Sequence, residues 1–145
     1  MKFMSGLQPL ALLALRLALS LIFIYHGYPK LVHPTGAMRE FFVSHGFPGY
    51  FLSVAGTLEC FGAVMLFVGL YTRPAALLLA IEMALAIWKV HSGHGFMAVK
   101  YYEFPLVIGA ACLALGTIGA GAISVDNLLF DESGRKRRSA KSSKD

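Results

Sequence analysis

The sequence has few charged residues for its length. Asp, Glu, Lys and Arg make up 14% of its 145 residues, whereas a typical soluble domain has about a quarter. Hydrophobic residues make up 57%, and the mean hydropathy is +0.64. These values argue against an ordinary soluble globule and indicate that the long apolar segments are suited to lipid.

The chain is also poor in cysteine and in recognisable catalytic motifs. Cys60 and Cys112 both lie in apolar segments, with no CxxC and no haem or zinc spacing. They are expected to be small buried hydrophobes rather than a disulfide or metal pair. No nucleophile elbow, glycine-rich phosphate loop or dinucleotide fingerprint is present. His91 and His94 would straddle a helix end, so no metal site is predicted, and whether the chain is an enzyme stays open.

What the sequence does contain is a set of four long apolar segments. None shows period-two alternation, so helices rather than a barrel are expected. The fold prediction is all-α, a four-helix transmembrane bundle. Its helices are expected at about 8–31, 50–70, 74–91 and 103–123.

The ends of the chain are predicted to differ from this core. Residues 1–7 form a short head, residues 8–126 form the membrane domain, and residues 127–145 form a basic tail that is expected to be disordered after about Ser133. Arg16 interrupts the first apolar segment and no small-x-small site closes it, so this segment is expected to remain as an anchor. In the connection 32–50, the part from Ala37 to Ser44 is either a short amphipathic interfacial helix or an irregular loop.

The basic residues predict the orientation. Six of the 13 Lys and Arg residues lie in the tail, which includes the run Arg135, Lys136, Arg137 and Arg138. By the positive-inside rule, both termini of this multi-pass protein are predicted to lie in the cytoplasm. The tail is expected to contact anionic lipid headgroups, and no nucleic-acid binding is predicted.

Ionisable side chains inside a membrane are costly, so each one is a candidate functional residue. Arg16 and Glu82 are each about eight residues in from the cytoplasmic ends of their predicted helices. At about 1.5 Å per residue their depths match, and a buried Arg16–Glu82 ion pair is predicted. It would fix how the bundle assembles.

A second group of polar residues is predicted near the outer ends of the helices. It would form an outward-facing pocket in which histidine titrates near neutral pH and burial disfavours the ionised carboxyl group. Such a pocket could pass protons to a quinone-like head. The alternative is a set of ordinary interface residues. The candidates are His26, Glu59, Trp88, His91, Tyr102 and Glu103.

The order of these polar residues resembles that of the DoxX family of small bacterial membrane proteins. The resemblance covers about residues 10–126 and excludes the head and the basic tail. Its segments are 15–31 (LRLALSLIFIYHGYPKL), 56–63 (GTLECFGA), 69–76 (GLYTRPAA), 88–91 (WKVH), 95–96 (GF) and 102–106 (YEFPL).

The resemblance implies a four-helix membrane protein of the kind linked to quinone-dependent oxidation of reduced sulfur compounds and to oxidative or thiol stress. The family's polar positions would be Arg16, His26, Lys30, Glu59, Arg73, His91 and Glu103. The first hypothesis is therefore a quinone-side or assembly subunit of a membrane redox complex, with quinone as the ligand and soluble redox enzymes as partners. The alternatives are a non-enzymatic scaffold for soluble partners and a carrier of a small lipophilic molecule. Formation of a homo-oligomer is left open.

Overall fold

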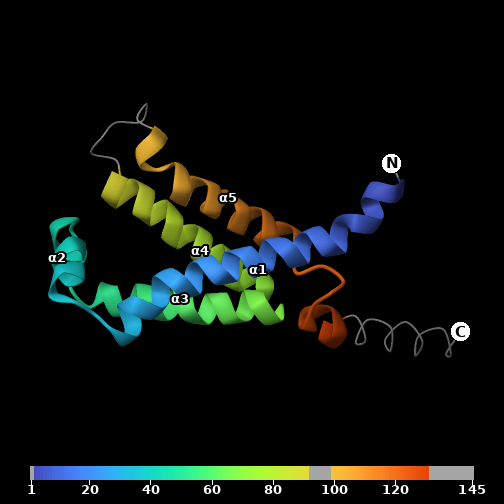
Figure 1. The fold of residues 1–145 in the computed structure, drawn as a ribbon, viewed down its shortest axis with the longest axis horizontal. Coiled ribbons are helices and arrows are strands. Elements are labelled where there is room, and N and C mark those ends of the chain that lie inside the picture. Colours follow the sequence, from blue (N-terminus) through green and yellow to red (C-terminus); the bar gives the residue numbers. More distant parts are fainter. Residues whose placement is uncertain (1, 92–98, 131–145) are drawn as a thin grey trace, which may run out of the picture.

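The computed structural model describes residues 2–91 and 99–130, and all regular elements within these ranges are helical (Figure 1). The last of them is a short helix over residues 125–130. The others are α1 (Lys2–Val32), α2 (Gly36–Ser44), α3 (Phe51–Val68), α4 (Thr72–Ala86), the π-helical η1 (Ile87–His91), the 3₁₀-helical η3 (Val99–Tyr101) and α5 (Glu103–Ile118).

The ends of two helices differ from the prediction. The expected head 1–7 is helical from Lys2, and α1 continues through Pro9, which removes one backbone hydrogen bond without ending the helix. The last long helix was expected to reach residue 123, but α5 ends at Ile118. Gly119 and Gly121 follow with φ of 96° and 79°, a left-handed conformation that stops a helix. The expected tail begins inside the helix 125–130, and the prediction of disorder after Ser133 lies outside the described residues.

The connection between α1 and α3 contains the amphipathic helix that the sequence allowed. The Thr35 hydroxyl caps α2 by accepting a hydrogen bond from the Met38 N–H at 3.2 Å. None of the residues of α2 is buried. This helix packs against α3 at the end of the bundle opposite to the start of α1 and to the helix 125–130 (Figure 1).

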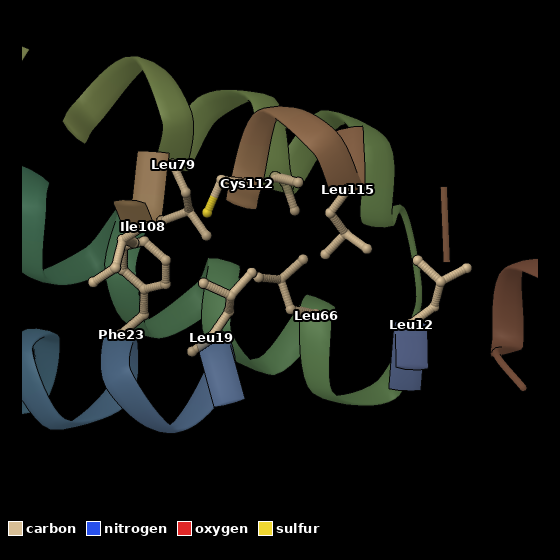
Figure 2. Packing of buried hydrophobic residues seen from close by; sticks show 11 residues of the cluster. Leu12, Leu19, Phe23, Leu66, Leu79, Ile108, Cys112 and Leu115 are labelled. Atoms are coloured by element: carbon tan, nitrogen blue, oxygen red, sulfur yellow. The ribbon is translucent and has the colours of Figure 1, made fainter. Parts of the chain in front are cut away.

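The long helices pack as two pairs, α1 with α3 and α4 with α5, and α3 joins the pairs by packing on α4. Their shared core contains Leu19 and Phe23 of α1, Leu66 of α3, Leu79 of α4 and Cys112 of α5 (Figure 2). Leu66, Leu79 and Cys112 are completely buried. This core keeps the four helices together along their length, so the polar residues at each end have fixed neighbours.

The outer surface of the helices is apolar. Leu21 on α1, Phe61 on α3 and Val107 on α5 are 70%, 63% and 67% exposed. α1 from Gly6 and the whole of α3 are long and apolar enough to cross a membrane, and α5 is a shorter apolar helix. Two charged side chains, Arg16 and Glu59, are buried while these large apolar groups are exposed, as expected where lipid is the solvent.

Candidate functional site: a charged cavity at one end of the bundle

An ion pair joins α1 to α3 near the end of the bundle where α2 lies. The Lys30 ammonium contacts both carboxylate oxygens of Glu59, at 2.6 and 2.7 Å. The Glu59 side chain is 3% exposed and that of Lys30 is 22% exposed. Burying an ion pair has a large desolvation cost, which close geometry of this kind offsets.

Two glycines allow the ion pair to form. A Cβ added at Gly27 of α1 would lie 2.7 Å from the Glu59 Cβ, and one added at Gly56 of α3 would lie 2.9 Å from the Lys30 Cβ. Real Cβ atoms do not approach this closely, so larger residues at either position would push the helices apart. Small residues permit such close backbone contact between helices in membranes.

The ion pair lines a cavity of about 880 Å³ between α1, α2, α3 and α4. Its walls are mainly apolar, with Phe41 and Phe42 from α2, Phe51 and Leu58 from α3 and Ile81 from α4 among them. The polar side chains on its wall are those of Tyr25, His26, Lys30, His45, Glu59 and Glu82. A large apolar cavity with a few charged groups is the usual form of a site for a small lipophilic molecule.

Glu82 lies in this cavity and not beside Arg16, so the predicted Arg16–Glu82 ion pair is wrong. Glu82 is about ten residues, or roughly 15 Å, beyond the start of α4 at Thr72. The first turns of α1 project past the other helices (Figure 1), so Arg16 lies near the opposite end of the bundle. The matched depths were measured from helix ends that do not align.

Arg16 contacts backbone carbonyls instead of a carboxylate. Its guanidinium donates to Leu66 O at 2.8 Å and Phe67 O at 3.0 Å, in the last turn of α3. It also donates to Ala120 O at 3.1 Å and Ile123 O at 2.6 Å, beyond α5. Carbonyls at a helix C-terminus lack intrahelical partners and attract cations. Arg16 is 1% exposed, and it fastens three segments of the chain together.

The other predicted pocket residues are dispersed. His26 lines the cavity together with Glu59, and its ring lies 5.8 Å from that of Phe104. Trp88, Tyr102 and Glu103 do not line it. Trp88 is 65% exposed with the Lys89 ammonium over its ring, Tyr102 is buried at the start of α5, and Glu103 is exposed.

Two predictions concern residues whose side chains the structure does not describe. His91 is the last residue of η1, and His94 lies in the segment 92–98; both side chains fall outside the described part of the chain. In the ranges 2–91 and 99–130, no three side chains of His, Cys, Asp or Glu form a group that could hold a metal ion.

Of the six polar side chains on the cavity wall, the predicted pocket contained His26 and Glu59. It did not contain Tyr25, Lys30, His45 and Glu82. A signal for Lys30 was present, because it follows His26 by one helical turn and therefore shares its face. Its opposite charge to Glu59, near the same end of the bundle, could then have indicated the pair. The family resemblance included Lys30 among its polar positions but gave it no partner.

Comparison with known proteins gives a family match. The family model described as DoxX matches residues 11–92, which include Arg16, Lys30, Glu59 and Glu82. The match therefore covers the whole of the cavity wall. No solved structure matches the chain.

Several curated proteins are similar over most of their length. A protein of Haemophilus influenzae with no described role is 35% identical over 127 residues, which cover 85% of this chain and 93% of the relative. The Bacillus subtilis protein named "Putative oxidoreductase CatD" is 31% identical, with 81% of this chain and 86% of the relative covered. The Escherichia coli "Inner membrane protein YqjF" is 29% identical, with 87% and 97% covered.

Proposed function

Because the chain belongs to the DoxX family and is a membrane protein, we propose that it is the quinone-side subunit of a membrane redox complex. Its cavity would hold the quinone. The observation that carries this proposal is the Lys30–Glu59 ion pair, which lies in the wall of an otherwise apolar cavity of about 880 Å³. The similarity to a relative whose name contains the word oxidoreductase supports it.

The cavity residues suit the chemistry of a quinone head. Reduction of a quinone to a hydroquinone takes two electrons and two protons. In this proposal, a partner enzyme supplies the electrons by oxidising a reduced sulfur or thiol compound. Lys30 has a third N–H beyond the two that reach Glu59, and it can donate to a quinone oxygen on which negative charge develops. His26 and the cavity carboxyl groups would exchange the protons.

The proposal includes four membrane spans with both termini in the cytoplasm. α4 continues into η1, so that Thr72–His91 forms about 20 helical residues, the length needed to cross a bilayer. The charge of the tail, with Arg135, Lys136, Arg137 and Arg138, favours the cytoplasmic side. The cavity then lies toward the opposite face of the inner membrane.

The test is quinone retention and turnover. The full chain is purified from its native membrane in mild detergent, and bound quinone is extracted and measured by mass spectrometry. We expect Glu59→Gln and His26→Ala to lower the retained quinone at least about tenfold, as loss of a hydrogen bond to a charged group does, and to abolish quinone-linked turnover. Glu103→Gln, at an exposed position outside the cavity, is the matched control. Full retention and turnover in both cavity variants would refute the proposal.

A carrier of a lipophilic molecule is the second candidate, and the same cavity favours it. It predicts a bound lipophilic molecule with no change in oxidation state and no co-purifying redox enzyme. The scaffold alternative makes a different prediction, because deletion of residues 132–145 would release soluble partners while cavity variants would not. Mass spectrometry of the same purified sample separates the three.

A further inference from the structure

Among the described residues, the wall of the cavity contains one buried side-chain oxygen that has no hydrogen-bond partner. In the part of the chain that the structure describes, Oε2 of Glu82 is buried and accepts no hydrogen bond. Both oxygens of Glu59, by contrast, are paired with Lys30. A buried acceptor without a donor is unfavourable, and each such group in a native protein needs an explanation, of which a functional role is one.

The charges around Glu82 restrict what can approach it. Lys30 and Glu59 line the same cavity as Glu82. The Lys30 ammonium disfavours a cationic head, while the Glu59 carboxylate disfavours an anionic one. An uncharged head that donates a hydrogen bond satisfies Oε2 without meeting either repulsion.

We propose that Glu82 recognises the redox state of the ligand's head by accepting a hydrogen bond from its hydroxyl group. The cavity then binds the reduced, hydroxyl-bearing form more tightly than the oxidised form. This inference rests on the proposed function, because it takes the cavity as the quinone site. A hydroquinone offers the donor that Oε2 lacks, whereas the quinone of almost the same shape has only acceptors. The Lys30 ammonium can donate to an oxygen of either form, so the discrimination that we assign to Glu82 does not come from Lys30.

The test compares the two forms of one probe. The full chain is reconstituted in lipid nanodiscs, and the binding of a decyl-substituted benzoquinone and of its hydroquinone is titrated separately under argon. The wild type is expected to bind the hydroquinone about 10- to 100-fold more tightly. In Glu82→Leu the preference falls below about threefold, because no acceptor remains. Glu82→Gln keeps the size of the side chain and a neutral acceptor, so it retains a smaller preference than the wild type.

Glu103→Gln again serves as the control and is expected to keep the full preference. If Glu82→Leu does not fold, Glu82→Gln decides the matter, because it is nearly isosteric. A preference smaller than that of the wild type then supports the role of Glu82. Equal binding of both forms by the wild type, or the full wild-type preference in the Glu82 variants that fold, overturns the role of Glu82 and leaves the proposed function standing. Failure of the wild type to bind either form overturns both.

Discussion

The two ends of the bundle each bury ionisable side chains, but they differ in what those side chains leave unpaired. At one end, the Arg16 guanidinium donates to four carbonyl oxygens at 2.6 to 3.1 Å. At the other end, Lys30 and Glu59 pair, but Oε2 of Glu82 is buried with no partner in the described ranges, and it lines a large cavity. Burial of a charge can therefore serve the fold alone, as it does at Arg16. The unpaired oxygen in the cavity wall distinguishes the end at which we propose a ligand site.

The Arg16 end has a smaller hollow, of about 500 Å³. The Asp126 carboxylate on its wall accepts from Tyr71 N at 2.7 Å and from Thr72 N at 2.9 Å. It thereby caps the start of α4 and holds Tyr71 in a left-handed conformation, with φ of 48°. This end also has an unpaired buried oxygen among the described residues, Oγ1 of Thr72, but Thr72 does not line the hollow. The contrast is therefore one of position, because the unpaired oxygen of Glu82 lies in a cavity wall and that of Thr72 does not.

The largest loss of stability is expected for Arg16→Met, which tests whether Arg16 holds its end of the bundle together. The change leaves buried carbonyls of α3 and of the segment after α5 without donors, and we expect a loss of about 4 kcal/mol in the free energy of unfolding. Unfolding in mixed detergent micelles measures it. Arg39→Met, at an exposed position of α2, is the control. A stable Arg16→Met protein would mean that this end is not held by its arginine.

The next largest effect is expected at the ion pair. Lys30→Met leaves the Glu59 carboxylate buried and uncompensated, which costs about 3 kcal/mol in the free energy of unfolding. The double variant Lys30→Met, Glu59→Met removes both charges and should regain most of that loss, while quinone retention stays low. The same unfolding assay and the quinone extraction give the two readouts. If the double variant is no more stable than the single one, the pair is not the source of the effect.

The smallest effect is expected at Asp126. Asp126→Ala removes the acceptor of two N–H groups at the start of α4 and should cost about 1 kcal/mol, as loss of a helix cap does. Because Asp126 lies at the Arg16 end, ligand binding at the other end should not change. Thermal unfolding and the nanodisc titration test the two statements. A loss of ligand affinity without a loss of stability would show that the ends are coupled.

The sequence predicted the helical character of the chain, its membrane location and the family, because apolar length and the order of motifs can be read directly. It also placed His26 and Glu59 at the same end, where the structure has both in the cavity wall. It did not predict the partners of Arg16. These are backbone carbonyls, which every residue has, so no side chain signals them.

The prediction of an Arg16–Glu82 ion pair was wrong for a related reason. Depth along a helix follows from counting residues, but the rotation of each helix and the alignment of helix ends depend on packing. Gly27 and Gly56 determine how closely α1 and α3 approach, and this contact brings Lys30 to Glu59. The sequence has small residues at Gly56, Cys60 and Ala63, three to four positions apart, but this spacing does not show which charged side chain the close contact would admit.

The contacts of Arg16 also constrain the order in which the protein can be assembled during synthesis. Its first partners, Leu66 and Phe67, emerge from the ribosome 50 and 51 residues later, and Ala120 and Ile123 follow at 104 and 107 residues. Until then, the Arg16 guanidinium lacks these carbonyl partners. A nascent chain that stops after α5 would still lack two of the four acceptors, so the first helix obtains its full set of contacts only when nearly all of the described chain has been made.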